Sequence, residues 1–160
     1  MAVLTTSGRT AVAVAIAARP LHLAWGNGDP AWDAELIPES LEATALTSEL
    51  GRVVAAVIGY AVPDPLGPIE VPTGFYRLSE TPTNHLLLRC DYGYPDAADQ
   101  VIRETGLFMD SVIADDLPPG QRYFTPAEVV DPGSLVAIEH FPPVIRTPLN
   151  REQFEFVLTL

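Results

Sequence analysis

The chain has 160 residues, 48% of them hydrophobic, and a mean hydropathy of +0.18. A chain of this length and composition buries a substantial core, which excludes intrinsic disorder and predicts a single domain over residues 1–160. Twenty-one acidic residues against nine basic ones give a formal net charge of -12. Because this charge repels phosphate backbones and anionic lipids, neither nucleic acid nor a membrane is expected as a partner.

The first predicted element is a helix from about Thr6 to Arg19. Threonine and serine are good helix caps at its start, and Pro20 ends it. The apolar run inside it resembles the hydrophobic part of a secretion signal, but it is short and alanine-rich and has no basic residues before it. A helix of the mature protein is therefore the preferred interpretation. No run approaches the ~18 apolar residues that a transmembrane span requires.

A short strand from Leu21 to Trp25 is predicted next, ended by the turn-forming residues Gly26–Asp29. A second helix is predicted over Pro38–Arg52, because Ser40 can cap it and Gly51 can end it. The helical part of the chain is thus expected over about residues 5–50.

Residues 52–160 are predicted to be strand-rich. Their β-branched and aromatic runs are bounded by Pro, Gly, Asn or Asp, as strands usually are. These runs are Arg52–Val62, Asn84–Tyr94, Gln100–Asp110, Gly133–Val144 and Glu152–Leu160. The predicted fold class is α+β, with two N-terminal helices packed on a mostly antiparallel β-sheet or sandwich.

The sequence contains no motif for a metal, a cofactor or a nucleophile. His22, His85 and His140 are far apart and lack ligand spacing, and Cys90 is the only cysteine. The turn Gly26–Asp29 lacks the Gly-Lys-Ser/Thr ending of a phosphate loop, and no serine lies in a Gly-x-Ser-x-Gly elbow. We therefore expect no catalytic residue, no metal and no cofactor.

Charged residues do occur inside the strand-like runs. Alternation places Glu104 on one face with Ile102 and Phe108, beside Arg103 on the other face. A lone buried carboxylate is unfavourable, so Glu104 needs a cation, a set of hydrogen-bond donors, or a proton. Glu139 lies in a similar strand-like context.

We predict that Arg103, Glu104, Glu139 and Arg89 take part in structural ion pairs that fix strand register. The alternative is that the two glutamates form the carboxylate pair of a glycan hydrolase, which requires carboxyl groups ~5–9.5 Å apart.

Three segments in order, "LTTSGRTAVAVAIAARPLHLAWGNGDP", "LTSELGR" and "VIRETGLF", resemble the N-terminal domain of bacteriophage tail-collar fibre proteins. The matching pieces are Thr5–Arg19, Trp25–Asp29, Leu46–Arg52 and Ile102–Phe108. In that family the domain attaches the fibre to the baseplate. The resemblance implies that Ile102–Phe108 is a conformational hairpin with Gly106 as its turn or kink, and it carries over no catalytic residues.

Tail-collar fibres usually continue into a trimeric shaft, which is not expected in a chain of 160 residues. The expected function is a non-enzymatic structural protein of the phage virion, at the baseplate or tail-fibre junction and made in the host cytoplasm. It is expected in several copies, bound to fibres or to other tail and baseplate proteins. A tail-associated glycan hydrolase and a neck or capsid-decoration protein are the alternatives.

Aromatic residues and the predicted hairpin are the candidates for partner contacts, with Trp32, Tyr92 and Tyr94 expected to be exposed. The candidate interaction residues are Trp25, Trp32, Tyr92, Tyr94, Gly106 and Phe108.

Overall fold

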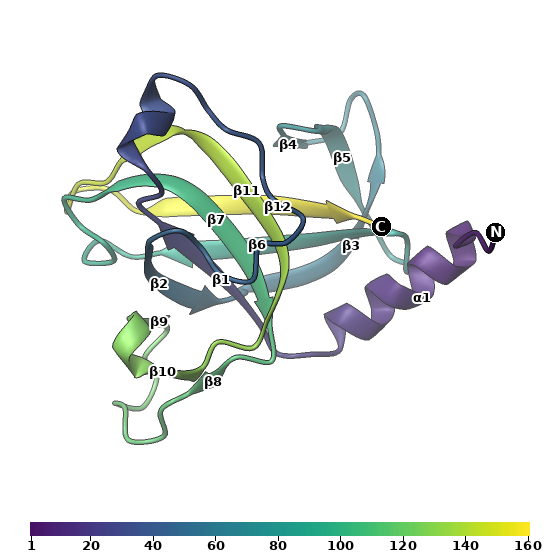
Figure 1. Cartoon of the computed structure of the whole chain (residues 1–160). Coiled ribbons are helices and arrows are strands. Elements are labelled where there is room, and N and C mark those ends of the chain that lie inside the picture. The colour runs from purple at the N-terminus through teal and green to yellow at the C-terminus, as the bar shows by residue number, and fades with distance from the viewer. The chain divides into compact units, whose positions relative to one another are not determined.

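The computed structural model describes all residues, 1–160, and is built mainly from strands (Figure 1). It contains a single α-helix, α1 (Thr6–Ala17). The predicted α+β fold with two N-terminal helices is therefore wrong. No helix in the structure is long and apolar enough to cross a membrane.

The chain forms two compact units, and each is described by itself. The first contains Met1–Arg19, Ala55–Cys90 and Gln153–Leu160, and the second contains Pro20–Val54 and Asp91–Glu152. The single-domain organisation stays a prediction.

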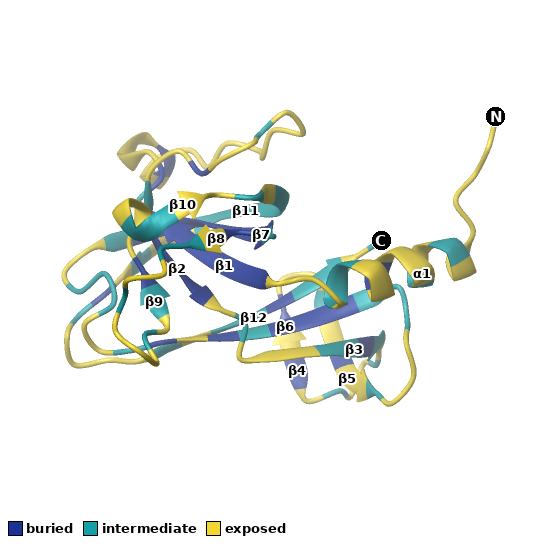
Figure 2. Ribbon diagram, turned by 90° about the horizontal axis from the view of Figure 1, so that it is seen from below, coloured by how far each residue is buried: buried dark blue, intermediate teal, exposed yellow.

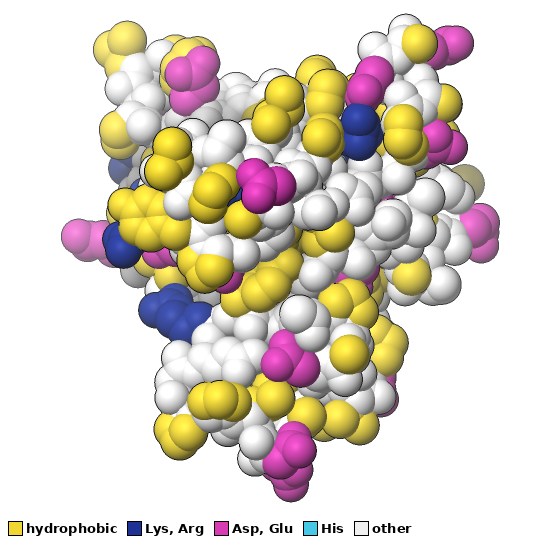
Figure 3. All heavy atoms as spheres, turned by 90° about the vertical axis from the view of Figure 1, so that its left-hand side faces the viewer, with side chains coloured by type: hydrophobic (Ala, Val, Ile, Leu, Met, Phe, Trp, Pro, Cys, Tyr) yellow, Lys and Arg dark blue, Asp and Glu magenta, His cyan; other side chains and the backbone are white.

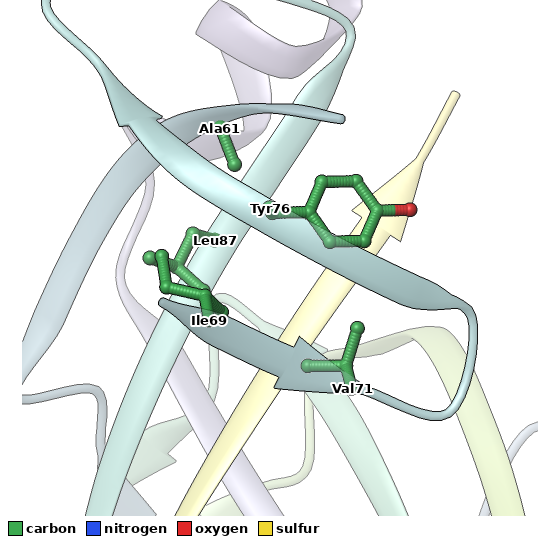
Figure 4. Packing of buried hydrophobic residues seen from close by; sticks show 5 residues of the cluster. All are labelled: Ala61, Ile69, Val71, Tyr76 and Leu87. Atoms are coloured by element: carbon green, nitrogen blue, oxygen red, sulfur yellow. The ribbon is translucent and has the colours of Figure 1, made fainter. Parts of the chain in front are cut away.

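The first unit combines α1 with a five-stranded sheet in the order β12-β6-β3-β5-β4. Its strands are β3 (Val57–Pro63), β4 (Ile69–Val71), β5 (Gly74–Ser79), β6 (His85–Tyr92) and β12 (Glu152–Thr159). Strand β3 pairs antiparallel with both β5 and β6, and β4 pairs antiparallel with β5. Side chains from four of these strands meet in a small core (Figure 4). The core consists of Ala61, Ile69, Val71, Tyr76 and Leu87.

Helix α1 begins where the sequence predicts it. The Oγ1 atom of Thr5 accepts a hydrogen bond from the backbone N–H of Gly8 at 3.1 Å, which caps the first turn. The helix ends at Ala17, before Pro20. Only Ala13 is buried, and Figure 2 shows most of the helix in the exposed colour.

The second unit contains a five-stranded sheet in the order β11-β7-β1-β2-β9, with antiparallel pairing throughout. Its strands are β1 (Leu21–Gly26), β2 (Glu49–Val54), β7 (Val101–Met109), β9 (Tyr123–Phe124) and β11 (Ser134–Ile145). Two short strands, β8 (Val112–Ile113) and β10 (Val129–Asp131), pair separately, and two 3-10 helices complete the unit, η1 (Pro30–Asp33) and η2 (Pro126–Glu128). Strand β7 lies between β11 and β1, and residues 102–108 are all buried.

The predicted second helix is absent. Ser40 does accept a hydrogen bond from the backbone N–H of Glu42, but the turn does not continue, and residues 34–48 form irregular structure. The leucines do not line one helical face, because Leu41 is fully exposed whereas Leu46 is buried against Ala24. Pairing of residues 49–54 with β1 overrides the local helix signals.

The predicted strand Arg52–Val62 is in fact two strands. Its first part belongs to β2 in the second unit, and its second part is β3 in the first unit. The break falls at Ala55 and Ala56, where the N–H of Ala56 donates to the carbonyl of Arg89 at 2.8 Å. A continuous apolar run gives no local sign of such a break, because both parts satisfy the same strand pattern.

Candidate functional site

The carboxylate of Glu104 is completely buried and is bound by backbone donors. Its Oε1 atom accepts from the N–H groups of Ser48 at 2.8 Å and Gly28 at 3.2 Å. Its Oε2 atom accepts from the N–H of Thr47 at 2.9 Å. We call Glu104 and these three N–H groups the Glu104 cluster. The expected cation partner of Glu104 is wrong, and a set of donors stabilises the carboxylate instead.

The turn after β1 packs closely against this carboxylate. Gly28 has a φ of +60°, and a Cβ there would lie 2.4 Å from the ring of Trp32. A Cβ on Gly26 would lie 2.5 Å from Oε1 of Glu104. The glycines of this turn therefore permit close packing, as a structural turn requires.

The segment that follows β1 binds Arg103. Its guanidinium makes two hydrogen bonds to the carboxylate of Asp33, at 2.6 and 2.8 Å, and a third to the carbonyl of Asn27 at 3.1 Å. The hydrogen bond from Arg103 lowers the pKa of Asp33. The sequence gives no sign that Asp33 is the partner, because 70 residues separate it from Arg103.

Glu104 and Glu139 do not form a carboxylate pair. In the antiparallel pairing of β7 with β11, Glu104 lies opposite His140, whereas Glu139 lies opposite Thr105. Directly opposed residues project from the same face, so the two glutamates project from opposite faces of the sheet. Glu139 is half-buried, and burial together with the nearby charge of Glu39 raises its pKa.

Two of the candidate interaction residues are stacked inside the second unit. The rings of Trp25 and Tyr92 stack with their centroids 3.5 Å apart, and Nε1 of Trp25 donates to the hydroxyl of Tyr123 at 3.3 Å. The hydroxyl of Tyr92 donates to the carbonyl of Leu23 at 2.8 Å. Both aromatic residues are part of the buried interior, and the expected exposure of Tyr92 is wrong.

Trp32 is also buried, with its ring stacked on that of His140 at 4.2 Å, so its expected exposure is wrong as well. Tyr94 is exposed as expected, with the guanidinium of Arg151 over its ring at 4.8 Å. Among the candidate aromatic residues, Tyr94 is the one that a partner protein can reach in this structure.

Gly106 and Phe108 lie within a continuous strand rather than in a hairpin. Gly106 pairs with Ala24 on one side and Ile138 on the other, and Phe108 is completely buried. A Cβ on Gly106 would lie 2.9 Å from side-chain atoms of Leu46 and Leu135. Close packing therefore explains this glycine, and the expected turn at Gly106 is wrong.

Arg89, in the first unit, forms an ion pair with Glu155. Its Nε atom donates to Oε1 of Glu155 at 3.0 Å. The pair joins β6 to β12 within one sheet, and a register-fixing role for it stays a prediction.

Two completely buried arginines bind groups that are not evident from the sequence. Arg52 binds the carboxylate of Glu49 through two hydrogen bonds and the hydroxyl of Ser111 at 2.7 Å. Arg146 donates to the carbonyls of Gly93 at 2.7 Å and Asn150 at 2.9 Å. The only sequence signal for either arginine is its position in an apolar run, and that position does not indicate which group the arginine binds.

His22 is buried beside Arg52, and its Nδ1 atom has no hydrogen-bond partner. Burial and, secondarily, the positive charge of Arg52 lower its pKa to about 4. An unfolded chain takes up this proton near pH 6.5, whereas the folded chain takes it up only near the lowered pKa. Acidification through this window therefore favours unfolding.

We expect the His22 contribution to lower the free energy of unfolding by about 1.4 kcal/mol between pH 7.5 and pH 5.5. The measurement is urea denaturation at both pH values, on the wild type and on His22→Phe. The variant retains a ring beside Phe124 but cannot take up the proton. Equal losses of stability in the two proteins would show that His22 is not the titrating group.

No group of three or more histidine, cysteine, aspartate or glutamate side chains is arranged to hold a metal ion. Cys90, the only cysteine, is buried. The charged groups that the sequence singles out are used in internal contacts, apart from the half-buried Glu139. The geometry around them is that of a structural framework.

Comparison with protein families gives one match that covers the chain. The family model described as "Baseplate wedge 3 tail fiber network component" matches residues 1–160. No curated protein matches the chain. The match agrees with the phage baseplate and tail-fibre association that the resemblance implies, but it does not support the narrower assignment to tail-collar attachment domains. The chain belongs to the family of baseplate wedge 3 tail fiber network components, which are structural proteins of the phage baseplate and tail-fibre network.

Proposed function

We propose that this chain is a non-catalytic docking subunit that holds tail fibres or neighbouring tail proteins at the baseplate. The observation that carries the proposal is the family match over the whole chain, whose description refers to the baseplate wedge and the tail-fibre network. A network component works by binding several neighbours, so the chain is expected in multiple copies.

The internal chemistry supports a non-catalytic role. Glu104 accepts hydrogen bonds from three backbone donors, and Arg103 and Arg89 are bound to Asp33 and Glu155. Glu139 projects from the face opposite to Glu104 and has no second carboxylate from β7 beside it. The two-carboxylate geometry that glycoside hydrolysis needs is therefore missing from this pair.

Cross-linking of intact phage particles tests the docking role. Because the chain contains no lysine, carboxyl-reactive cross-linkers that use its 21 acidic residues are the suitable reagents. We expect cross-links to baseplate or fibre proteins, identified by mass spectrometry. A chain found free of the particle, or cross-linked only to capsid proteins, would contradict the proposal.

An assay of the purified chain on peptidoglycan and on host surface polysaccharide tests the non-catalytic role. We expect no hydrolysis above a buffer control. Hydrolysis that disappears in Glu139→Gln but persists in the exposed-site control Glu70→Gln would identify an enzyme instead.

A further inference from the structure

Helix α1 has an exposed surface that is unusual for a helix in water. A surface helix normally presents polar residues outward, and a helix that is apolar all round is normally buried. In α1, Val12 and Val14 are 38% and 40% exposed and flank the single buried residue, Ala13. Ala11 and Ala15 are exposed as well. The helix therefore lacks a partner over most of its circumference.

The residues before the helix extend this apolar surface. Val3 and Leu4 are 79% and 53% exposed. With α1 they form the N-terminal segment, residues 1–20. Its length is at the low end of the roughly 20–30 residues that each side of a specific protein interface contributes.

The charge of the N-terminal segment differs from that of the rest of the chain. Arg9 and Arg19 are its only charged side chains, so it carries +2 whereas the remainder carries -14. Five of the seven arginines in that remainder are already in ion pairs within their own units, which leaves Arg122 and Arg151. On the face drawn in Figure 3, acidic side chains recur among exposed hydrophobic ones. That surface has the chemistry to accept a basic, apolar helix.

We propose that the N-terminal segment of one copy docks on the acidic, apolar surface of a second copy of this chain, outside that copy's own N-terminal segment. A symmetric contact between two N-terminal segments would bring like charges together and leave the acidic surfaces without cations. A head-to-tail contact pairs opposite charges. A head-to-tail contact also links copies into a ring or an open array. This inference rests on the proposed function in a tail-fibre network and extends it.

The proposal predicts that the purified full chain self-associates as its concentration rises, and that salt weakens the association. The measurement is sedimentation velocity over a concentration series, at about 50 mM and about 500 mM salt, between which charge screening changes strongly. We expect Val12→Asp/Val14→Asp to weaken association roughly tenfold or more, because two apolar contacts are lost and two like charges are added. We expect Arg9→Glu to weaken it similarly.

Matched variants control for net charge. Leu66→Asp/Leu149→Asp places two carboxylates at positions that are 94% and 83% exposed, and Arg122→Glu repeats the charge reversal at an exposed arginine of the second unit. Neither should weaken the association, because negative charge added to residues 21–160 does not repel the basic N-terminal segment. Circular dichroism of every variant shows whether α1 and the sheets are retained, so a loss of association is not confused with a loss of folding.

A photoreactive residue at position 14 identifies the docking surface. In a mixture of isotopically heavy and light chains, the expected cross-link joins the helix of one copy to residues 21–160 of another. Cross-links between the two N-terminal segments would overturn the head-to-tail contact. A monomer at every concentration, or association that the α1 variants leave unchanged, would overturn the proposal. The cross-linking of intact particles would still test the proposed docking function independently.

Discussion

Glu104→Ala is expected to lower the free energy of unfolding by about 4 kcal/mol. The substitution leaves the N–H groups of Gly28, Thr47 and Ser48 without their acceptor at a completely buried position. It also releases the irregular segment before β2, whose last residues the carboxylate holds against β7. The measurement is equilibrium urea denaturation at pH 7.5.

Two further variants separate the hydrogen bonds from the charge. Glu104→Gln retains one acceptor oxygen and is expected to lower the free energy of unfolding by about 2 kcal/mol. Glu139→Gln, on the opposite face of the same sheet and only half-buried, should change it by less than about 0.5 kcal/mol. Similar effects of the two glutamine substitutions would show that the Glu104 cluster is not an important stabilising element.

Arg146→Leu is expected to lower the free energy of unfolding by about 3 kcal/mol. The guanidinium is completely buried and donates to the carbonyls of Gly93 and Asn150, and it forms an ion pair with Glu152 at 3.6 Å. Leucine fills much of the space but leaves these acceptors without donors. Thermal unfolding at neutral pH, followed by circular dichroism, measures the loss.

Arg151→Leu is the matched control for this substitution. Arg151 is exposed and lies over the ring of Tyr94, so its removal should change the free energy of unfolding by less than about 1 kcal/mol. If Arg146→Leu is no more destabilising than the control, the buried guanidinium does not organise the loops around it.

Local signals predicted several elements of the fold. The threonine cap and Pro20 located α1, and the apolar alternation located β1, β7 and most of β11. The predicted second helix failed because its determining contacts are non-local. The N–H groups of Thr47 and Ser48 bind a carboxylate more than fifty residues away, and β2 pairs with β1.

The candidate site was predictable only in part, for a similar reason. The alternation correctly indicated a buried carboxylate at Glu104, and physical chemistry required that it find a cation, a set of donors or a proton. Which donors it found depended on the glycine turn and on the segment before β2. Likewise, Trp25 and Tyr92 were visible as large aromatic residues, but only the fold shows that they stack on each other.

Amide hydrogen exchange of the chain, free in solution and within intact particles, tests the docking account most directly. The amides of α1 have few buried neighbours in the free chain, since only Ala13 is buried, so they should exchange quickly there and become protected in the particle. The amides of β7 should be protected in both states. If α1 and the exposed surfaces exchange equally fast in the two states, the chain does not dock through them, and the account is contradicted.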